Sequence, residues 1–487
     1  MDLKKIISSS KFNLLFFFGI VFVAIFFRFY LTPERYGFDF DPTRDALISI
    51  YGSTHLKFPL IGPMSGIAPF TFGPWYYYQI IFSKIILPFD YAPWVYIGIT
   101  SVISVVAVYF IGKELKGERF GLLLALIMAL SPAELGPITG LSNPNLVSMY
   151  ASLSLLIFIV ALKRTIPAWL YFVWGLLLGI GINDHFQMVG FLILPTVLFI
   201  YKLKSLSWKN ILLFSAGIIS TFLPLLYFNL THDWHTIRGL IYFEKIGKYA
   251  VYTPNRWLFY LRDFWPNFWS YVTGVPLFLG SITLIYSLGI MAYSIYKQKP
   301  KPLYLLLFLV FLFNFVILRY FSGPRENYYF IYLHPFIVLV FGASIYYSLK
   351  NKFLFIPGIV ISALFLFFVL KEDINRLHVE DRFIDLTSQT EKIVKNYPNK
   401  KFNIYHCGEK DRNRSQAIAF FLYNKGLLDE NGTKIGIIGS DCSIRNLGNL
   451  KFKEVELTEN KNELIEDGWL EITPENIYKE TVEWYKK

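Results

Sequence analysis

The chain has 487 residues, of which 54% are hydrophobic and 19% aromatic, and its mean hydropathy is +0.43. A soluble domain of this length does not need so much apolar surface, so the composition predicts an integral membrane protein. The net charge of +12 is typical of basic cytoplasmic loops that face anionic lipid, and it does not indicate a nucleic-acid partner.

Apolar runs recur along the first 370 residues, and each is long enough to cross a hydrocarbon core of about 30 Å. We expect a polytopic α-helical protein of about eleven transmembrane helices. They lie near residues 13–30, 93–111, 120–136, 145–162, 168–183, 186–201, 210–228, 273–295, 303–319, 329–348 and 353–370. The first run ends in bulky side chains with no small-residue cleavage site, so it predicts an anchor rather than a signal peptide.

The charges of the loops predict the orientation of the chain. With a cytoplasmic N-terminus, the inner segments carry 16 basic and 3 acidic residues, whereas the outer segments before residue 371 carry 12 basic and 11 acidic residues. Short cytoplasmic loops are enriched in Lys and Arg in this way. We therefore expect a multi-pass protein of the cell membrane with an extracytoplasmic C-terminal region.

Two parts of the chain differ in composition. Residues 1–370 form the predicted membrane domain, and residues 371–487 are polar. The polar part has strand-like pieces at 402–405 and 434–438 and a helical piece near 415–424, which predicts a small soluble α/β domain. Both cysteines, Cys407 and Cys442, lie in it. An oxidising outer compartment permits a disulfide between them, and two unpaired buried thiols remain the alternative.

The first predicted outer loop, residues 31–92, contains the densest group of charges in the membrane part. Asp39, Asp41 and Asp45 lie within seven residues, together with Arg44. A carboxylate here can accept a proton from an acceptor group or hold a divalent ion. The alternative is a solvated loop in which Asp41 caps a helix ahead of Pro42.

Two short segments of this loop, at 45–51 and 74–88, are expected to be helices that lie along the membrane interface. The loop also contains an aromatic stretch at 66–78 that includes Tyr76. Aromatic rings suit stacking on sugars or holding prenyl chains, and an ordinary interfacial aromatic belt is the alternative.

Short motifs follow one another along the chain in a characteristic order. They are the acidic group at 39–45, Gly-Pro-Trp-Tyr-Tyr-Tyr at 73–78, Ser-Pro at 131–132, Ser-Asn-Pro-Asn at 142–145, Asn-Asp-His-Phe at 183–186 and Phe-Asn-Leu-Thr-His-Asp-Trp at 228–234. In this order the chain resembles the GT-C superfamily of membrane glycosyltransferases. Within it, the chain is most similar to the protein O-mannosyltransferase and aminoarabinose-transferase group, which is glycosyltransferase family 39-like.

The resemblance implies a GT-C-like catalytic domain at residues 1–370 and a polyprenyl-phosphate sugar donor. Asp41 occupies the place of the catalytic aspartate of the family's first loop, with Asp39 or Asp45 as a helper. Family members often have Glu where this chain has Pro42, an acidic residue near Asn143 and Asn145, and His where this chain has Gly73. These departures leave open whether the site holds a divalent metal ion.

Further side chains are candidates to bind substrate. Arg256, Arg262 and Arg325 are expected to contact the donor phosphate, since guanidinium groups match phosphate oxygens. The candidates for other substrate contacts are Arg44, Tyr76, Asn143, Asn145, His185, His232 and Glu326. An ion pair that caps a helix (Arg325 with Glu326) and ordinary interfacial histidines are the alternatives.

The interpretation is a glycosyltransferase that moves a sugar to an extracytoplasmic protein, lipid or cell-wall glycan, with Asp41 as the base. One alternative is a transporter or flippase of lipid-linked sugars, which would need ionisable residues deep within its spans, and these are scarce here. Another is a membrane scaffold with an outer binding domain, which would leave the group at 39–45 without a chemical role.

Overall fold

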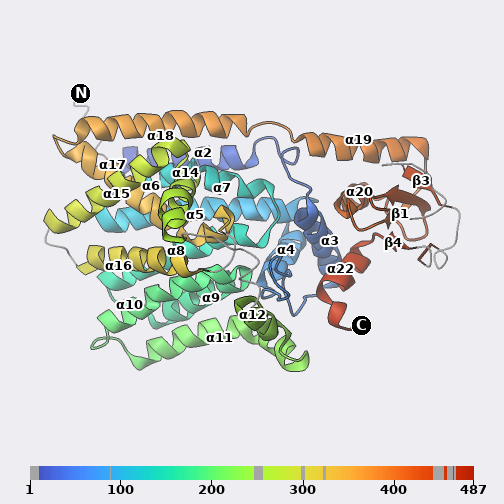
Figure 1. Ribbon diagram of the computed structural model, residues 1–487, viewed down its shortest axis with the longest axis horizontal. Helices are drawn as coiled ribbons and strands as arrows, with labels where there is room; N and C mark the ends of the chain where they lie inside the picture. The colour runs from blue at the N-terminus through green and yellow to red at the C-terminus, as the bar shows by residue number, and fades with distance from the viewer. Residues whose placement is uncertain are drawn as a thin grey trace.

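The computed structural model describes residues 10–486 with the exception of 88, 246–255, 298–301, 322–324, 443–453, 458–463 and 466–467. Figure 1 shows a bundle of long, roughly parallel helices and, beyond one end of it, a small sheet with its own helices. The polytopic helical fold with a small α/β region near the C-terminus is as predicted.

Eight helical segments of the described chain are long and apolar enough to cross a membrane. They are α2 (Ser10–Phe29), α5 (Ala92–Lys116), η2 with α8 (Asn143–Lys163), α11 (Trp208–Thr231), α15 (Leu277–Lys297), α16 with η6 (Pro302–Tyr320), η7 with α17 (Asn327–Lys350) and α18 (Phe355–Asn375). A helix lies at each of the other three predicted spans as well. These are α6 (Glu118–Ala129), which bends by 56° into α7 (Pro132–Leu135) and η1 (Pro137–Thr139), then α9 (Ala168–Asp184), and η3 (Phe186–Leu192) with α10 (Ile193–Tyr201).

Glycines allow two of these helices to approach closely. A Cβ atom at Gly175 of α9 would lie 2.1 Å from the Phe214 carbonyl oxygen of α11, and one at Gly217 of α11 would lie 2.3 Å from that of Phe172. Small residues at such contacts compensate for the weak hydrophobic driving force between helices in lipid. The sequence therefore places α9 and the motif at its end against α11.

The first outer loop contains two helices, as predicted, but the first is longer than expected. Helix α3 covers Phe40–His55 and α4 covers Trp75–Ile86. Asp41 therefore lies in the first turn of a helix, where its negative charge interacts favourably with the helix dipole and stabilises the helix. The segment between α11 and α15 contains α12 (His235–Lys245), α13 (Arg256–Phe259), η5 (Tyr260–Phe264) and α14 (Trp265–Thr273).

The described part of the C-terminal region contains a four-stranded sheet of order β3-β2-β1-β4. Strands β1 (Phe402–Cys407) and β2 (Thr433–Ile438) are parallel, and α20 (Arg412–Asn424) connects them. Strands β3 (Glu454–Glu456) and β4 (Trp469–Glu471) pair antiparallel to β2 and β1. Helices α19 (Asp381–Asn396) and α22 (Pro474–Val482) and the short η8 (Trp484–Lys486) complete the region. Helix α18 continues past residue 370, to Asn375.

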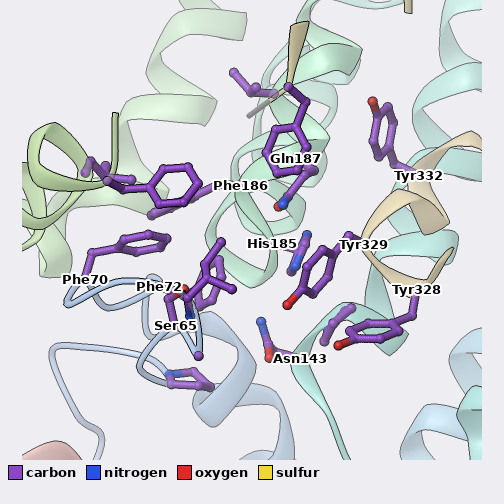
Figure 2. A pocket seen from close by; sticks show the side chains of 18 of the residues that line it. Ser65, Phe70, Phe72, Asn143, His185, Phe186, Gln187, Tyr328, Tyr329 and Tyr332 are labelled. Atoms are coloured by element: carbon purple, nitrogen blue, oxygen red, sulfur yellow. Dashed lines mark hydrogen bonds between the residues drawn. The ribbon is translucent and has the colours of Figure 1, made fainter. Parts of the chain in front are cut away.

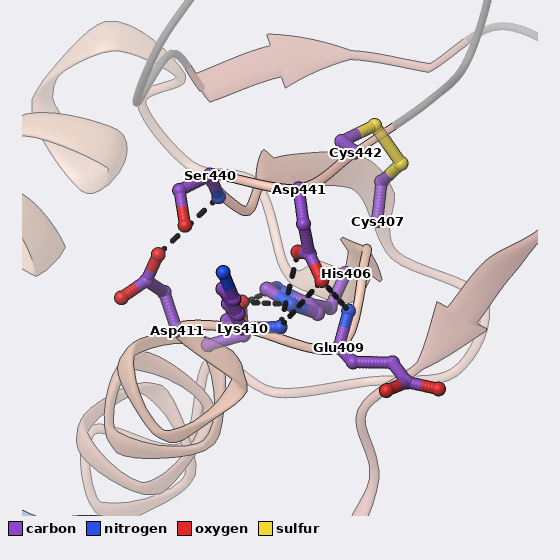
Figure 3. Close-up of a disulfide and its surroundings, with 9 residues drawn as sticks. His406, Cys407, Glu409, Lys410, Asp411, Ser440, Asp441 and Cys442 are labelled. Carbon is purple, nitrogen blue, oxygen red and sulfur yellow. Dashed lines mark hydrogen bonds between the residues drawn. A yellow bond between two sulfur atoms is a disulfide. The ribbon is translucent and has the colours of Figure 1, made fainter.

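A disulfide joins Cys407 at the end of β1 to Cys442, with 5.3 Å between the two Cα atoms. Figure 3 shows it beside the loop that follows β1, where the Asp441 carboxylate accepts hydrogen bonds from the backbone N–H groups of Glu409 and Lys410. The covalent bond and these hydrogen bonds hold the loops after the two parallel strands together.

The C-terminal region packs directly on α3, which lies between the bundle and the sheet in Figure 1. The Phe38 ring lies 4.9 Å from that of Phe421, and the Thr43 hydroxyl donates a hydrogen bond of 3.1 Å to Gln416. These contacts with α20 hold in place the helix that carries Asp41.

Candidate active site

A cavity of about 620 Å³ opens between α3, the loop after it, η3, α12, α16 and η7. Figure 2 shows side chains from the loop after α3, from η2 and η3 and from η7 around it. Asp41, Arg44, Asn143 and His185 all line the cavity. Four of the predicted site residues, from three distant motifs, therefore meet in one place.

One wall of the cavity is aromatic. The His185 ring stacks on Phe72 with 5.4 Å between centroids, and its other neighbour is Tyr329 at 5.2 Å. Phe70 and Phe186 stack beside them at 5.7 Å. Burial lowers the pKa of His185 to about 3, so the imidazole is neutral at physiological pH and can act as a hydrogen-bond donor or acceptor but not as a cation.

The charged groups at the cavity lie on α3, where one arginine forms ion pairs with two aspartates. Arg44 bridges two carboxylates, with Nη1 at 2.8 Å from Asp41 and Nε at 2.8 Å from Asp45. The Asp41 side chain is 55% exposed, whereas that of Asp45 is 1% exposed. Asp41 is therefore the carboxylate that a substrate can reach.

Asp45 is the buried partner of Arg44 and is itself held by two tyrosines. Its carboxylate accepts hydrogen bonds from the Tyr76 hydroxyl at 2.9 Å and the Tyr77 hydroxyl at 3.3 Å, and both tyrosines are buried. Burial raises the pKa of Asp45 to about 6, and the charge of Arg44 opposes the shift. Asp45 and Tyr76, which do not line the cavity, are placed to orient Arg44.

A second set of buried hydrogen bonds holds the motif that ends α9. The Asn143 amide donates to the Asp184 backbone carbonyl at 2.5 Å, and the Gln79 amide donates to the Asp184 carboxylate at 3.0 Å. Gln79 in turn accepts a hydrogen bond of 2.5 Å from the Tyr150 hydroxyl. Asn143 and His185 are thereby fixed at neighbouring points of the cavity wall.

Gly73 has a steric reason to be glycine. Its backbone N–H donates to the Asn183 carbonyl at 3.1 Å, and an added Cβ would lie 1.7 Å from the Asn183 Oδ1 atom. The loop that carries Phe70 and Phe72 therefore lies directly on the end of α9. No larger side chain fits there without displacing one of these segments.

The three arginines predicted to bind phosphate do not line the cavity. Arg262 forms an exposed ion pair with Asp263 at 2.9 Å, and Arg256 begins α13. Arg325 is nearer, because its guanidinium donates hydrogen bonds to the carbonyl groups of Arg319 and Phe321, and Phe321 lines the cavity. Glu326 is exposed at the start of η7, and residues 322–324, just before Arg325, lie outside the described residues.

Three other predicted site residues also lie elsewhere. Asp39 forms an exposed ion pair of 2.6 Å with Arg382 of α19. The Asn145 amide donates to the carbonyl groups of Pro137 and Gly140, both at 2.7 Å. The His232 ring packs between Phe228 and Tyr485. Their contacts connect segments of the protein, and none of the three residues lines the cavity.

The described residues do not include a group of three or more His, Cys, Asp or Glu side chains that could hold a metal ion. The side chains around Asp41 are instead a guanidinium, an amide and a stacked neutral imidazole. These residues do not fit a metal centre.

The cavity also contains residues that the sequence did not single out. Gln187, Tyr328 and Tyr332 line it, and Figure 2 shows them beside His185 and Tyr329. Gln187 follows the Asn-Asp-His-Phe motif at 183–186, and the two tyrosines lie two and six residues after Glu326. Proximity to these motifs was the one available signal.

No family model and no curated protein matches the sequence. The structure, however, is similar to that of the oligosaccharyltransferase from Archaeoglobus fulgidus, with a TM-score of 0.53 and 12% identity over 85% of this chain and 64% of that one. It is also similar to ArnT from Cupriavidus metallidurans, with a TM-score of 0.52 and 11% identity over 85% of each chain. This chain has the GT-C fold.

The fold predicted from the order of the motifs is thus confirmed. The chain spans 64% of the length of the archaeal oligosaccharyltransferase. Structures of these two proteins include the archaeal AglB with an inhibitory peptide and a dolichol-phosphate, the archaeal enzyme with zinc and sulfate, and ArnT with undecaprenyl phosphate.

Proposed function

We propose that this GT-C-fold protein is a glycosyltransferase that moves a sugar from a polyprenyl-phosphate-linked donor to an extracytoplasmic protein, lipid or glycan. The observation that carries the proposal is the composition of one cavity. It combines an exposed carboxylate, Asp41, held by Arg44, with a broad aromatic and apolar wall. A reaction between a polar acceptor and a lipid-linked donor needs both kinds of surface side by side.

The wall of the cavity formed by α12 and α16 supports a lipid-linked donor. Leu240, Phe243, Phe313 and Ile317 line this side, and apolar side chains of this kind suit a prenyl chain. ArnT and AglB have been solved with undecaprenyl phosphate and a dolichol-phosphate, respectively. By analogy of fold, the same class of lipid phosphate is proposed here.

The aromatic wall suits the sugar. The rings of Phe72, His185 and Tyr329 lie in contact, with Phe72 stacked on His185 and Tyr329 tilted against it, and sugar C–H faces pack on aromatic rings. The Asn143 side chain and the neutral His185 ring add polar groups that can bind hydroxyls.

The proposed chemistry is an inverting displacement at the anomeric carbon. An acceptor hydroxyl or amine attacks this carbon while Asp41 takes the acceptor's proton, the new glycosidic bond forms, and the bond from the anomeric carbon to the phosphate oxygen breaks. The electron pair of that bond leaves with the polyprenyl phosphate. Arg44 is the guanidinium among the described cavity-lining residues, and it is proposed to stabilise the negative charge on the phosphate.

The three arginines outside the cavity have a smaller part in this proposal. Arg325 is retained as a second phosphate contact, since it binds the Phe321 carbonyl at the edge of the cavity. Arg256 and Arg262 remain candidates only for guiding the anionic head group toward the site.

The topology is proposed from loop charge, with a cytoplasmic N-terminus and the cavity on the outer face. Residues 1–370 are proposed as the catalytic domain and 371–487 as an extracytoplasmic domain. The disulfide between Cys407 and Cys442 supports an oxidising location for the latter.

The test is sugar transfer by purified protein in nanodiscs with a panel of polyprenyl-phosphate sugars. Asp41→Asn removes the base but keeps the shape of the side chain, so release of labelled sugar should fall by at least about 100-fold. Asp233→Asn is the matched control, because Asp233 is also an exposed aspartate paired with an arginine, outside the cavity. Equal transfer by wild type and Asp41→Asn would show that Asp41 is not the base. Release of no sugar by wild type on any donor would remove the proposed activity.

A further inference from the structure

An apolar cleft runs along α17 from Phe336, near η7, toward the C-terminal end of this helix, which is distant from the candidate active site. It opens between α15, α16 and α17 and has a volume of about 70 Å³. Its lining includes Ile290, Met291, Leu307, Phe311, Phe336 and Val340. The outward faces of the same helices carry exposed apolar side chains such as Ile285 and Leu309. The cleft is therefore a narrow slot in a surface of the kind that faces lipid tails.

The cleft widens into a basic hollow of about 570 Å³, with which it shares Ile290, Ser294 and Tyr347 as lining residues. Lys350 and Lys352 line the hollow at the junction of α17 and α18. Lys116 of α5 lines the cleft where the two meet, with its ammonium group 4.7 Å from the Tyr304 ring and 5.2 Å from the Tyr347 ring. Three positive charges thus surround the wide end of an apolar slot.

The two carboxylates near the junction of α5 and α6 are bound by other cations. Glu114 is bound by Lys163 and Arg164, and Glu118 is bound by Lys113. Within the described part of the chain, Lys350 and Lys352 form no ion pair with a carboxylate. The charge of the hollow therefore calls for an anion from outside the protein.

We propose that this cleft and hollow bind an anionic phospholipid, with one acyl chain between α16 and α17 and the phosphate head group among Lys116, Lys350 and Lys352. The arrangement matches the two parts of such a lipid, since a narrow apolar slot admits a single chain and ammonium groups at its wide end bind phosphate. The tyrosine rings beside Lys116 and Lys350 are placed as they are at membrane interfaces, where an aromatic body and a polar tip are both satisfied.

The basic hollow that would hold the head group is separate from the proposed glycosyl transfer. Helix α17 has 17 residues from His334 to Lys350, so about 25 Å separates its two ends. The candidate active site lies at η7, which precedes α17, and the lipid site lies at the C-terminal end of α17. The loop charges assign this second end to the cytoplasm, so the lipid would come from the opposite leaflet. The failure of one proposal leaves the other unaffected.

The test is lipid titration of the delipidated full-length protein in detergent, followed by native mass spectrometry. Phosphatidylglycerol should bind at least tenfold more tightly than phosphatidylcholine of the same chain length. The double variant Lys350→Gln/Lys352→Gln should weaken phosphatidylglycerol binding about 25-fold, since each lysine near a phosphate contributes about fivefold. Its two lysines are exposed, so the fold should be kept.

The matched control is Lys204→Gln/Lys209→Gln, which removes two exposed charges from another basic loop and should leave the affinity unchanged. Ala343→Leu tests the slot, because Ala343 lines the cleft and a larger side chain should weaken both lipids equally. Equal binding of the two lipids by wild type, or the same loss in the control pair, would overturn the proposal.

Discussion

Removal of the Tyr76 hydroxyl tests the supporting role assigned to Asp45. Tyr76→Phe keeps the ring and deletes the donor of the 2.9 Å hydrogen bond to the Asp45 carboxylate. Tyr76 is 0% exposed and Asp45 is 1% exposed, so water cannot replace the lost partner. A hydrogen bond to a charged group contributes about 1.5–3 kcal/mol, and we expect a loss of stability of about 2 kcal/mol.

A second tyrosine provides a graded comparison. The Tyr77 hydroxyl lies 3.3 Å from the same carboxylate, and longer hydrogen bonds are weaker, so Tyr77→Phe should be less destabilising than Tyr76→Phe. Both changes should also lower the turnover number of sugar transfer, because Asp45 orients Arg44 and Arg44 holds Asp41. The measurements are thermal unfolding in detergent and transfer kinetics in nanodiscs.

The same substitution in an Asp45→Asn background is the control. Without the negative charge, the Tyr76 hydroxyl contributes about 1 kcal/mol, so the two changes should couple by about 1 kcal/mol in a double-mutant cycle. Unfolding of Tyr76→Phe at the wild-type temperature would refute the argument, as would an equal cost in both backgrounds.

Three further predictions follow from the same region. Gly73→Ala should destabilise the protein by about 1–3 kcal/mol and reduce transfer, because its Cβ meets Asn183. Gly19→Ala, with nothing within 4 Å of its Cβ, is the control, and equal unfolding temperatures would contradict the prediction. Burial raises the pKa of Asp45 to about 6, above the value of about 3.9 in unfolded chains. The stability of wild type relative to Asp45→Asn should therefore rise as pH falls from 7 to about 4 and then level off, and a pH-independent difference would be inconsistent with the shift. Arg382→Gln breaks an ion pair that is exposed on both sides and should cost less than about 1 kcal/mol. A loss of several kcal/mol in the melting curve would show that this contact between α19 and α3 is stronger than its exposure suggests.

The predicted spans and the observed helices agree for a local reason. Whether a segment such as 93–111 or 303–319 enters lipid depends on the summed hydropathy of consecutive residues, and this sum can be read from the sequence without knowing what the segment contacts. Helix ends were less accurate, and the first helix of the outer loop begins at Phe40 rather than near Asp45. The position at which α3 begins depends on its packing against the C-terminal region.

Part of the candidate site could also be predicted from the sequence. Asp41, Asn143 and His185 were singled out by three motifs, and the structure brings them to one cavity. Asp45 was predicted with them as a helper of Asp41. The helical repeat places Asp45 on the same side of α3 as Asp41, one turn further along. At that position the Tyr76 and Tyr77 side chains of α4 cover Asp45, so it is buried beneath Arg44.

The sequence by itself determined which segments are apolar, where the charges gather and in what order the motifs follow, because each of these is a property of neighbouring residues. The tertiary structure alone decided which side chains line the cavity. It placed His232 against Tyr485 and Asp39 against Arg382, and it brought Tyr329 to His185. Such pairings join segments far apart in the chain, and the close approach of packed helices selects them.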